Sequence, residues 1–391
     1  MTINDRAIKF YSTQSINIKD KQSILEVLAS GYLSRGPKIE EFEKKIGKIC
    51  NNKNVLTVNS ATSALQLAYQ IHGIKKNSIV WTTPLTFVAT ANTAIHFGAK
   101  IDFVDIDPAT LNICPSLLKK KLKEAKNSSN LPDFLTVVHF GGNPCDMDKI
   151  FELSKKYKFK IIEDASHALG ATYKGTRIGE CNYSCATVFS FHPVKMITTG
   201  EGGALLLNSE TDKQKACRLR SHGIDLLRKE KNTDRPEWYY EQVDLGYNFR
   251  MSEIQAGLGS SQIDRLGSFV ETRNQLAECY RESLSDLPIK FQETLSNCYS
   301  SHHLFTIEIT DRNFARDDLY RFFRDRNIGC QVHYIPVHMQ PFYKEMGFSE
   351  GMFKNVEHYF LNCLSLPLHQ GLKEIDIQFV SDELHDFFKK N

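Results

Sequence analysis

The stretch that decides the fold reads Phe189-Ser-Phe-His-Pro-Val-Lys-Met-Ile-Thr-Thr-Gly-Glu-Gly-Gly203. The apolar run 186–191 is typical of a buried strand, and Pro193 must end it because proline has no N–H for the ladder. Lys195 follows in a loop, before a glycine-rich turn and a second strand-like run at 205–207. A lysine desolvated between two buried strands has a lowered pKa and a nucleophilic amine. A lysine after a strand is also commonly a solvated loop charge, so the rest of the chain must decide between the two interpretations.

Length and composition indicate a globular protein of two domains. The chain has 391 residues, more than one hydrophobic core usually supports, and we expect a large domain at 1–266 and a smaller one at 267–391. The net charge of +3 gives no reason to expect a nucleic-acid or membrane partner. No apolar stretch approaches the ~18 residues of a membrane span and no signal pattern opens the chain, so we expect a cytoplasmic protein.

The ten cysteines are expected to be free thiols, with no metal site. They form no C-x-x-C motif, and the closest pair, Cys181 and Cys185, lacks histidines at the spacing of a zinc site. Free thiols are typical of a reducing compartment.

Strand-like runs alternate with helical patterns through the first half of the chain. This order predicts right-handed βαβ crossovers and a mainly parallel sheet, hence the α/β class. Ligands on such sheets bind at the carboxyl ends of the strands. The polar and aromatic residues that directly follow predicted strands are therefore expected to converge on one site: Ser60, Phe87, Asp164, His167 and Lys195.

Several of these positions have a second interpretation. The segment 59–65 opens a helix, where free N–H groups favour an anion, but Ser60 or Thr62 could simply cap that helix. Phe87 lies at a strand-to-helix corner, either over a flat ligand ring or in the core. Arg35, in the turn before the helix at 39–49, could bind a phosphate or remain a solvated charge.

The second half of the chain has a different pattern. Ser252-Glu-Ile-Gln255 reads as a capping box that opens a helix. The basic stretch 218–231 before it is expected to be a mobile loop. A long helix to about residue 284 then leads to a small α+β domain with strands at 303–309, 329–333 and 364–367.

With these elements placed, the chain resembles the pyridoxal-phosphate-dependent sugar aminotransferases of the DegT/DnrJ/EryC/StrS group over nearly its whole length. Nine short motifs in the same order carry the resemblance: Leu33–Lys38, Asn59–Leu65, Thr86–Asn92, Val104–Pro108, Glu163–Gly170, Ser190–Lys195, Gly200–Gly203, Gly246–Gln255 and Gln331–Pro336. The resemblance implies the fold of aspartate aminotransferase, called fold type I. It is closest to the branch that aminates UDP-4-keto-6-deoxy-N-acetyl-altrosamine for pseudaminic acid.

The resemblance also implies roles for the cofactor residues. Lys195 would hold pyridoxal 5'-phosphate and move the proton, while Asp164 would face the pyridine nitrogen and keep it protonated. His167 would lie by the ring hydroxyl and Phe87 would stack on the ring. Ala61, Thr62 and Ser190 would bind the phosphate, and Asn248 would reach it from the other subunit of a homodimer. Ser60 is a further expected cofactor-binding residue.

For the substrate, the resemblance implies a nucleotide-linked keto sugar, with L-glutamate as amino donor and pyridoxamine 5'-phosphate as the form between the half-reactions. The expected contacts are Tyr32, Arg35, Arg250, His333 and Tyr334, with a satisfied histidine of the small domain as the alternative for His333. Two alternatives stay open: another UDP-, dTDP- or GDP-linked keto sugar of O-antigen or lipid A synthesis, or a non-catalytic regulator that binds the cofactor or a sugar nucleotide. Intact Lys195 and Asp164 favour an enzyme.

Overall fold

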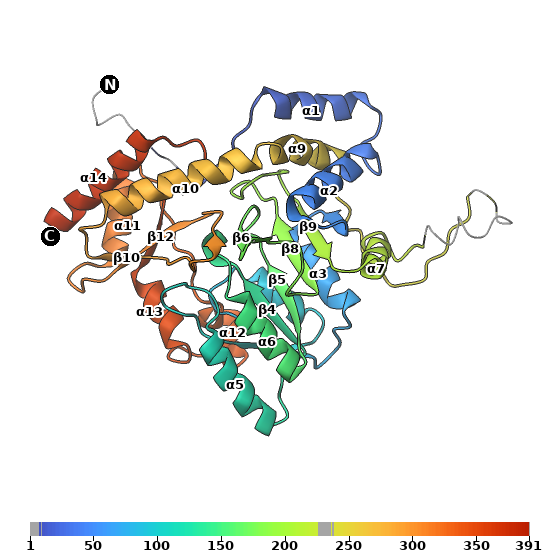
Figure 1. The fold of residues 1–391 in the computed structure, drawn as a ribbon, viewed down its shortest axis with the longest axis horizontal. Helices are drawn as coiled ribbons and strands as arrows, with labels where there is room; N and C mark the ends of the chain where they lie inside the picture. The colour runs from blue at the N-terminus through green and yellow to red at the C-terminus, as the bar shows by residue number, and fades with distance from the viewer. Residues whose placement is uncertain (1–7, 9, 226–235, 237, 391) are drawn as a thin grey trace.

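The structure, a computed structural model, describes residues 8, 10–225, 236 and 238–390, and its central feature is a seven-stranded sheet (Figure 1). The strand order is β1-β9-β8-β5-β4-β2-β3. The strands are β1 (Val55–Val58), β2 (Ile79–Thr82), β3 (Lys100–Phe103), β4 (Phe134–Val138), β5 (Lys160–Asp164), β8 (Ala186–Ser190) and β9 (Gly203–Leu207).

The sheet is mainly parallel, which confirms the expected class. Strands β8, β5, β4, β2 and β3 pair in parallel, and β9 pairs antiparallel with both β8 and β1. Strand β1 therefore runs in the same direction as β8. Every strand of this sheet except β9 ends at the same edge, where a ligand site is expected.

Successive apolar side chains of each strand point to opposite faces of the sheet, so both faces are apolar and both are covered by helices. Leu56 packs with α3 (Ala61–Ile71), α4 (Ala89–Ile95) and α7 (Glu210–Arg220) on one face. Its neighbour Val55 packs with α2 (Pro37–Cys50), α5 (Pro115–Asn127), α6 (Met147–Tyr157) and α9 (Glu253–Ile263) on the other. The expected capping box forms at the start of α9, and α1 (Ile18–Ala29) lies along this helix (Figure 1).

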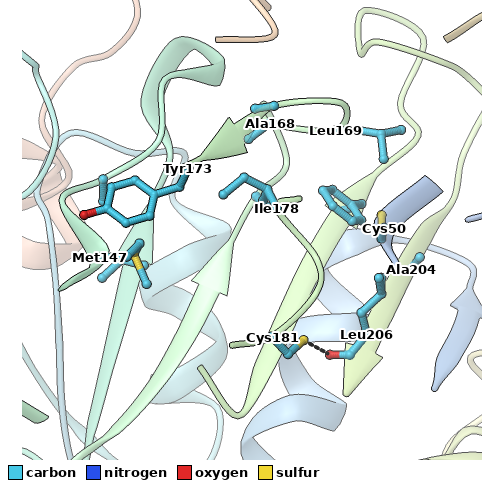
Figure 2. Close-up of a cluster of buried hydrophobic side chains, with 14 of the residues drawn as sticks. Cys50, Met147, Ala168, Leu169, Tyr173, Ile178, Cys181, Ala204 and Leu206 are labelled. Atoms are coloured by element: carbon cyan, nitrogen blue, oxygen red, sulfur yellow. Dashed lines mark hydrogen bonds between the residues drawn. The ribbon is translucent and has the colours of Figure 1, made fainter. Parts of the chain in front are cut away.

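The second of these cores contains buried thiols (Figure 2). Cys181 donates to the carbonyl oxygen of Leu206 at 3.4 Å, and Cys50 lies beside them. A small sheet of β11 (Cys298–Tyr299), β6 (Thr172–Tyr173) and β7 (Thr176–Arg177) brings Tyr173 into the same core. All ten cysteines are free, and no cluster in the described part of the chain could hold a metal ion.

The C-terminal part has its own core. Helix α10 (Leu266–Ser283) leads to a sheet of β10 (Ile289–Phe291), β12 (Phe305–Ile309) and β13 (Cys363–Leu366), packed with α11 (Arg316–Asp325) and α14 (Glu374–Lys390). The short helices α12 (Pro341–Glu345) and α13 (Lys354–Asn362) pack instead against the large sheet's core.

Two expectations about local structure were wrong. The segment 329–333 is no strand: it makes a single bridge, Gln331 to Ser365, because the chain then turns so that His333 and Tyr334 reach the ligand edge of the large sheet. The basic loop expected from 218 begins only after Arg220, because α7 is capped by Ser209 and continues to that residue. Residues 226–231 of that loop lie outside the described part. No helix among the described residues is long and apolar enough to cross a membrane.

Candidate active site

A cavity of about 490 Å³ lies at the carboxyl edge of the large sheet. Its lining includes ten of the residues expected at the site: Ser60, Ala61, Thr62, Phe87, Asp164, His167, Ser190, Lys195, His333 and Tyr334. These residues come from five separate segments of the chain. The structure therefore brings together the residues that follow β1, β2, β5 and β8, with two more from the C-terminal part.

Lys195 is half-buried in the loop after β8 and lines the cavity. Its N–H donates to the His192 carbonyl oxygen at 2.9 Å, which fixes the turn that carries the side chain. Burial lowers the pKa of Lys195 from 10.5 to about 8, although the nearby Asp164 charge opposes this shift. A minor part of the amine is thus uncharged near neutral pH, which favours the desolvated-lysine interpretation over a solvated loop charge.

Asp164 ends β5 with both carboxylate oxygens occupied. Oδ1 accepts from the Ser166 N–H at 3.1 Å and from the Ser166 hydroxyl at 2.6 Å. Oδ2 accepts from the Thr90 hydroxyl at 2.7 Å. Because that hydroxyl gives its hydrogen to Asp164, Thr86 must be the donor in its 2.7 Å bond with Thr90. Asp164 as a whole is 6% exposed, and these hydrogen bonds hold its carboxylate in one orientation near Lys195.

The N-terminus of α3 forms one wall of the cavity. Ser60 caps the helix by accepting from the Ser63 N–H, so the capping interpretation is correct. The first two helical N–H groups, of Ala61 and Thr62, have no partner within the helix and lie at the cavity. A Cβ on Gly203 would lie 2.6 Å from the Ala61 nitrogen, so only glycine lets β9 approach this helix end so closely. The anion site and the cap are thus compatible.

Three buried histidines line the deep side of the cavity. Burial, together with the Lys195 charge, lowers the pKa of His333 to about 3 and those of His167 and His303 well below their ordinary value. All three are therefore neutral at physiological pH. His333 has an internal partner, the Ser365 hydroxyl at 2.8 Å, so it is a satisfied buried histidine that also lines the cavity.

Sequence reasoning missed several residues of the site. Thr90 had a signal, since it lies one helical turn after Thr86 inside a quoted motif. Tyr11 and His303 had none, because they lie outside any motif, yet both line the cavity and Tyr11 packs against His333 at 4.9 Å between ring centroids.

The N-terminal segment is tied to the lysine loop. The Ser12 hydroxyl donates to the Val194 carbonyl oxygen at 3.0 Å, one residue before Lys195. The fully buried Arg273 of α10 reaches Ser12 at 3.4 Å and donates to the Leu368 carbonyl oxygen at 2.8 Å. This connection links the loop to the C-terminal part of the protein.

Four expected site residues do not line the cavity of this single chain: Tyr32, Arg35, Asn248 and Arg250. The segment carrying Asn248 and Arg250 runs beside the end of β1, where Asn59 donates to the Phe249 carbonyl oxygen at 2.9 Å. Burial and the neighbouring charges of Arg35 and Arg220 lower the pKa of Arg250. One of its guanidinium nitrogens, Nη1, is buried without a partner in the described chain.

A parallel sheet with a lysine, a carboxylate and a helix N-terminus at its carboxyl edge defines a pyridoxal-phosphate-dependent transferase of fold type I. The sequence profile of the DegT/DnrJ/EryC1/StrS aminotransferase family matches residues 14–385, and the chain belongs to that family. The expected fold, enzyme class and cofactor are thereby confirmed.

Known proteins resemble the chain over its whole length. The UDP-4-amino-4,6-dideoxy-N-acetyl-beta-L-altrosamine transaminase of Campylobacter jejuni is 38% identical over 387 residues, covering 97% of both chains. The structure of Helicobacter pylori PseC, an aminotransferase involved in the biosynthesis of pseudoaminic acid, superposes with a TM-score of 0.89 at 30% identity, covering 97% of this chain and 99% of that one. A candidate sugar aminotransferase of Streptococcus pneumoniae in its PLP form gives a TM-score of 0.87 at 26% identity, covering 96% and 97%.

The residues of the cavity fit this cofactor. The two unpartnered N–H groups of α3 suit its phosphate. The fixed carboxylate of Asp164 suits a protonated ring nitrogen, and the lowered pKa of Lys195 suits an aldehyde-binding amine.

Proposed function

We propose that this protein moves the amino group of L-glutamate to C4 of a UDP-linked 4-keto-6-deoxy sugar of the altrosamine type, as in pseudaminic acid synthesis. The observation that carries the proposal is a half-buried lysine of lowered pKa beside a fixed carboxylate in one cavity. The choice of sugar is supported by the names of the Campylobacter and Helicobacter relatives.

In this proposal, the chain's residues divide the work as follows. Ala61, Thr62 and Ser190, with Asn248 of a second subunit, bind the cofactor phosphate, and Ser60 lines the same part of the cofactor site. Asp164 holds the proton on the ring nitrogen, and Phe87, which is 61% exposed at the cavity mouth, covers the ring. When bound, the cofactor supplies an electron sink for the bonding pair released at the substrate carbon.

Lys195 is the proton carrier of this mechanism. With a pKa of about 8, Nζ exists in both protonation states at physiological pH. It can therefore accept the proton from the donor's α-carbon in the first half-reaction and deliver one to C4 of the sugar in the second. The three neutral histidines beside it, His167, His303 and His333, add no positive charge that would compete with it.

We further propose a homodimer with shared active sites. Helix α1 exposes Ile18 (65%), Leu25 (63%) and Leu28 (53%), an apolar face that a second copy would cover. The unpartnered guanidinium of Arg250, crowded by Arg35, calls for an anion, and the diphosphate of a nucleotide sugar supplies one.

In the same proposal, the remaining substrate contacts are Tyr32, His333 and Tyr334.

We also propose a cytoplasmic location, since ten free cysteines suit a reducing compartment. The division into domains at 266/267 is supported by the separate core around β12 and α14.

The deciding experiment is an absorbance spectrum of the purified protein. We expect a visible cofactor band that L-glutamate removes and that one UDP-linked 4-keto sugar restores. Lys195→Met should show neither change. A protein that binds pyridoxal phosphate but never responds to an amino donor would overturn the proposal in favour of a non-catalytic binding protein.

Sharing of the site has its own test. The inactive variants Lys195→Met and Asn248→Ala are mixed, unfolded and refolded together, because a mixed dimer restores one intact site. Recovered turnover supports the shared site, and no recovery alongside proven mixed dimers would overturn it.

A further inference from the structure

His167 and Tyr334 form a hydrogen-bond relay in the cavity wall. The Gly141 N–H donates to His167 Nδ1 at 3.3 Å, and His167 Nε2 lies 3.2 Å from the Tyr334 hydroxyl. Both histidine nitrogens are thus occupied within the protein. The contact with the cofactor's ring hydroxyl that the sequence predicts for His167 would have to share Nε2 with Tyr334.

The direction of each bond in this relay is fixed. A backbone N–H can only donate, so Nδ1 of His167 is the acceptor and carries no proton. Because burial and the nearby Lys195 charge hold the pKa of His167 well below its ordinary value, the ring keeps one proton, on Nε2. Nε2 therefore donates to the Tyr334 oxygen.

The first donor cannot easily turn away. Gly141 lies in a short 3-10 turn with a φ of 66°, and its carbonyl oxygen accepts from the Leu304 N–H at 3.2 Å. The preceding Phe140 is held by Asn112, whose side-chain oxygen accepts its N–H at 2.9 Å. His303 packs on the other side of His167, with ring centroids 4.4 Å apart. The imidazole is therefore held by contacts on several sides.

The relay determines what Tyr334 can offer. Since its oxygen accepts from His167, its own hydrogen must point elsewhere, and no other described residue accepts it. Burial raises the pKa of Tyr334, so the hydroxyl keeps this hydrogen at physiological pH. The hydroxyl lines the cavity and is left as a one-way donor.

We propose that His167 is a positioning residue that presents the Tyr334 hydroxyl as a hydrogen-bond donor to an acceptor oxygen of the ligand in the cavity. The acceptor is a phenolate oxygen of the cofactor or a carboxylate or carbonyl oxygen of a substrate. This inference deepens the proposed function and takes the identity of the ligand from it. It also predicts that glutamine can replace His167, because one amide oxygen and one amide nitrogen reproduce the acceptor and the donor.

The first test is independent of any reaction. Nitrogen-15 NMR of the histidine-labelled, cofactor-free protein reports which ring nitrogen carries the proton, with His167→Gln identifying the resonances. We expect an unprotonated Nδ1 and a protonated Nε2 for His167. The opposite tautomer, or a charged ring at neutral pH, would overturn the relay whether or not the protein is an aminotransferase.

The second test compares His167→Leu, His167→Gln and Tyr334→Phe, with Tyr299→Phe as a surface control. Cofactor affinity is measured by titrating the cofactor-free protein, and KM and kcat are measured for each substrate. We expect Tyr334→Phe and His167→Leu to weaken the same quantity by about tenfold, the effect of one neutral hydrogen bond. His167→Gln should recover most of the loss.

The double variant His167→Leu/Tyr334→Phe separates positioning from general damage. If His167 acts through Tyr334, the double variant is no worse than Tyr334→Phe alone. Multiplied losses, or a His167→Gln variant as impaired as His167→Leu, would overturn the proposal. A loss confined to the cofactor affinity assigns the acceptor to the cofactor, and a loss confined to one KM assigns it to that substrate.

Discussion

Replacing Thr90 by valine should weaken cofactor binding, because Thr90 supplies the only hydrogen bond that Asp164 Oδ2 receives within the described chain. The change keeps the shape of the side chain and removes the donor 2.7 Å from the carboxylate of Asp164, a residue that is 6% exposed. A hydrogen bond to a charged group contributes about 1.5–3 kcal/mol. If the bound state relies on it in full, affinity for pyridoxal phosphate falls about 10- to 100-fold.

The assay is a titration of the cofactor-free protein with pyridoxal phosphate, followed by absorbance. Thr93→Val is the matched control, since Thr93 is equally buried in α4 but donates to the Ala89 carbonyl oxygen of its own helix at 2.9 Å. Thr90→Ser keeps the hydroxyl and should bind nearly as well as the natural protein. Equal affinities for Thr90→Val and the natural protein would refute the reasoning, and so would an equal loss in Thr93→Val.

Three further predictions follow from buried groups and close approaches. The folded pKa of Lys195 is about 8 against the ordinary 10.5, so stability should rise with pH between these values. Below pH 8 the charged lysine destabilises the folded state by the full burial penalty, about 3 kcal/mol. Lys195→Met should therefore raise the Tm of the cofactor-free protein at neutral pH while abolishing turnover. An unchanged Tm in calorimetry would contradict this. Gly203→Ala should lower cofactor affinity at least about tenfold, because its methyl group would crowd the first N–H of α3. Gly267→Ala, in open space on α10, is the control and should leave folding stability unchanged or raise it by up to ~1 kcal/mol. The pyridoxal phosphate titration measures the affinity, and a thermal melt measures the stability. Glu253→Gln removes one of two carboxylate acceptors for the N–H groups of residues 36 and 38, and urea unfolding should show a loss of about 1–3 kcal/mol, a result that unchanged stability would contradict.

Much of the fold could be predicted from the sequence because its strands are short, apolar and separated by turn residues. The strands at 55–58, 79–82 and 160–164 follow such patterns, and their order predicted the shared edge at which Asp164 and Lys195 meet. The run 329–333 has a similar pattern but turns toward the cavity after one bridge. Periodicity alone cannot show that a tertiary site will take a segment away from a sheet.

The site residues also divide into those that the sequence could predict and those that it could not. Residues directly after a strand or at a helix start, such as Asp164 and Ala61, could be placed from local pattern. Tyr11 and His303 reach the cavity through long-range packing, which leaves no local signal. The role of His167 depended on which atoms its nitrogens meet, and only coordinates give that.

The connection from α10 through Ser12 to the lysine loop has a practical consequence for engineering the protein. The opening segment supplies a cavity wall through Tyr11 and a fastening for the loop through Ser12, although both lie far from Lys195 in sequence. Ile8 forms a β-bridge with Ile328, so the same segment also contacts the C-terminal part. Removing Tyr11 and Ser12 by truncation would therefore change the active site.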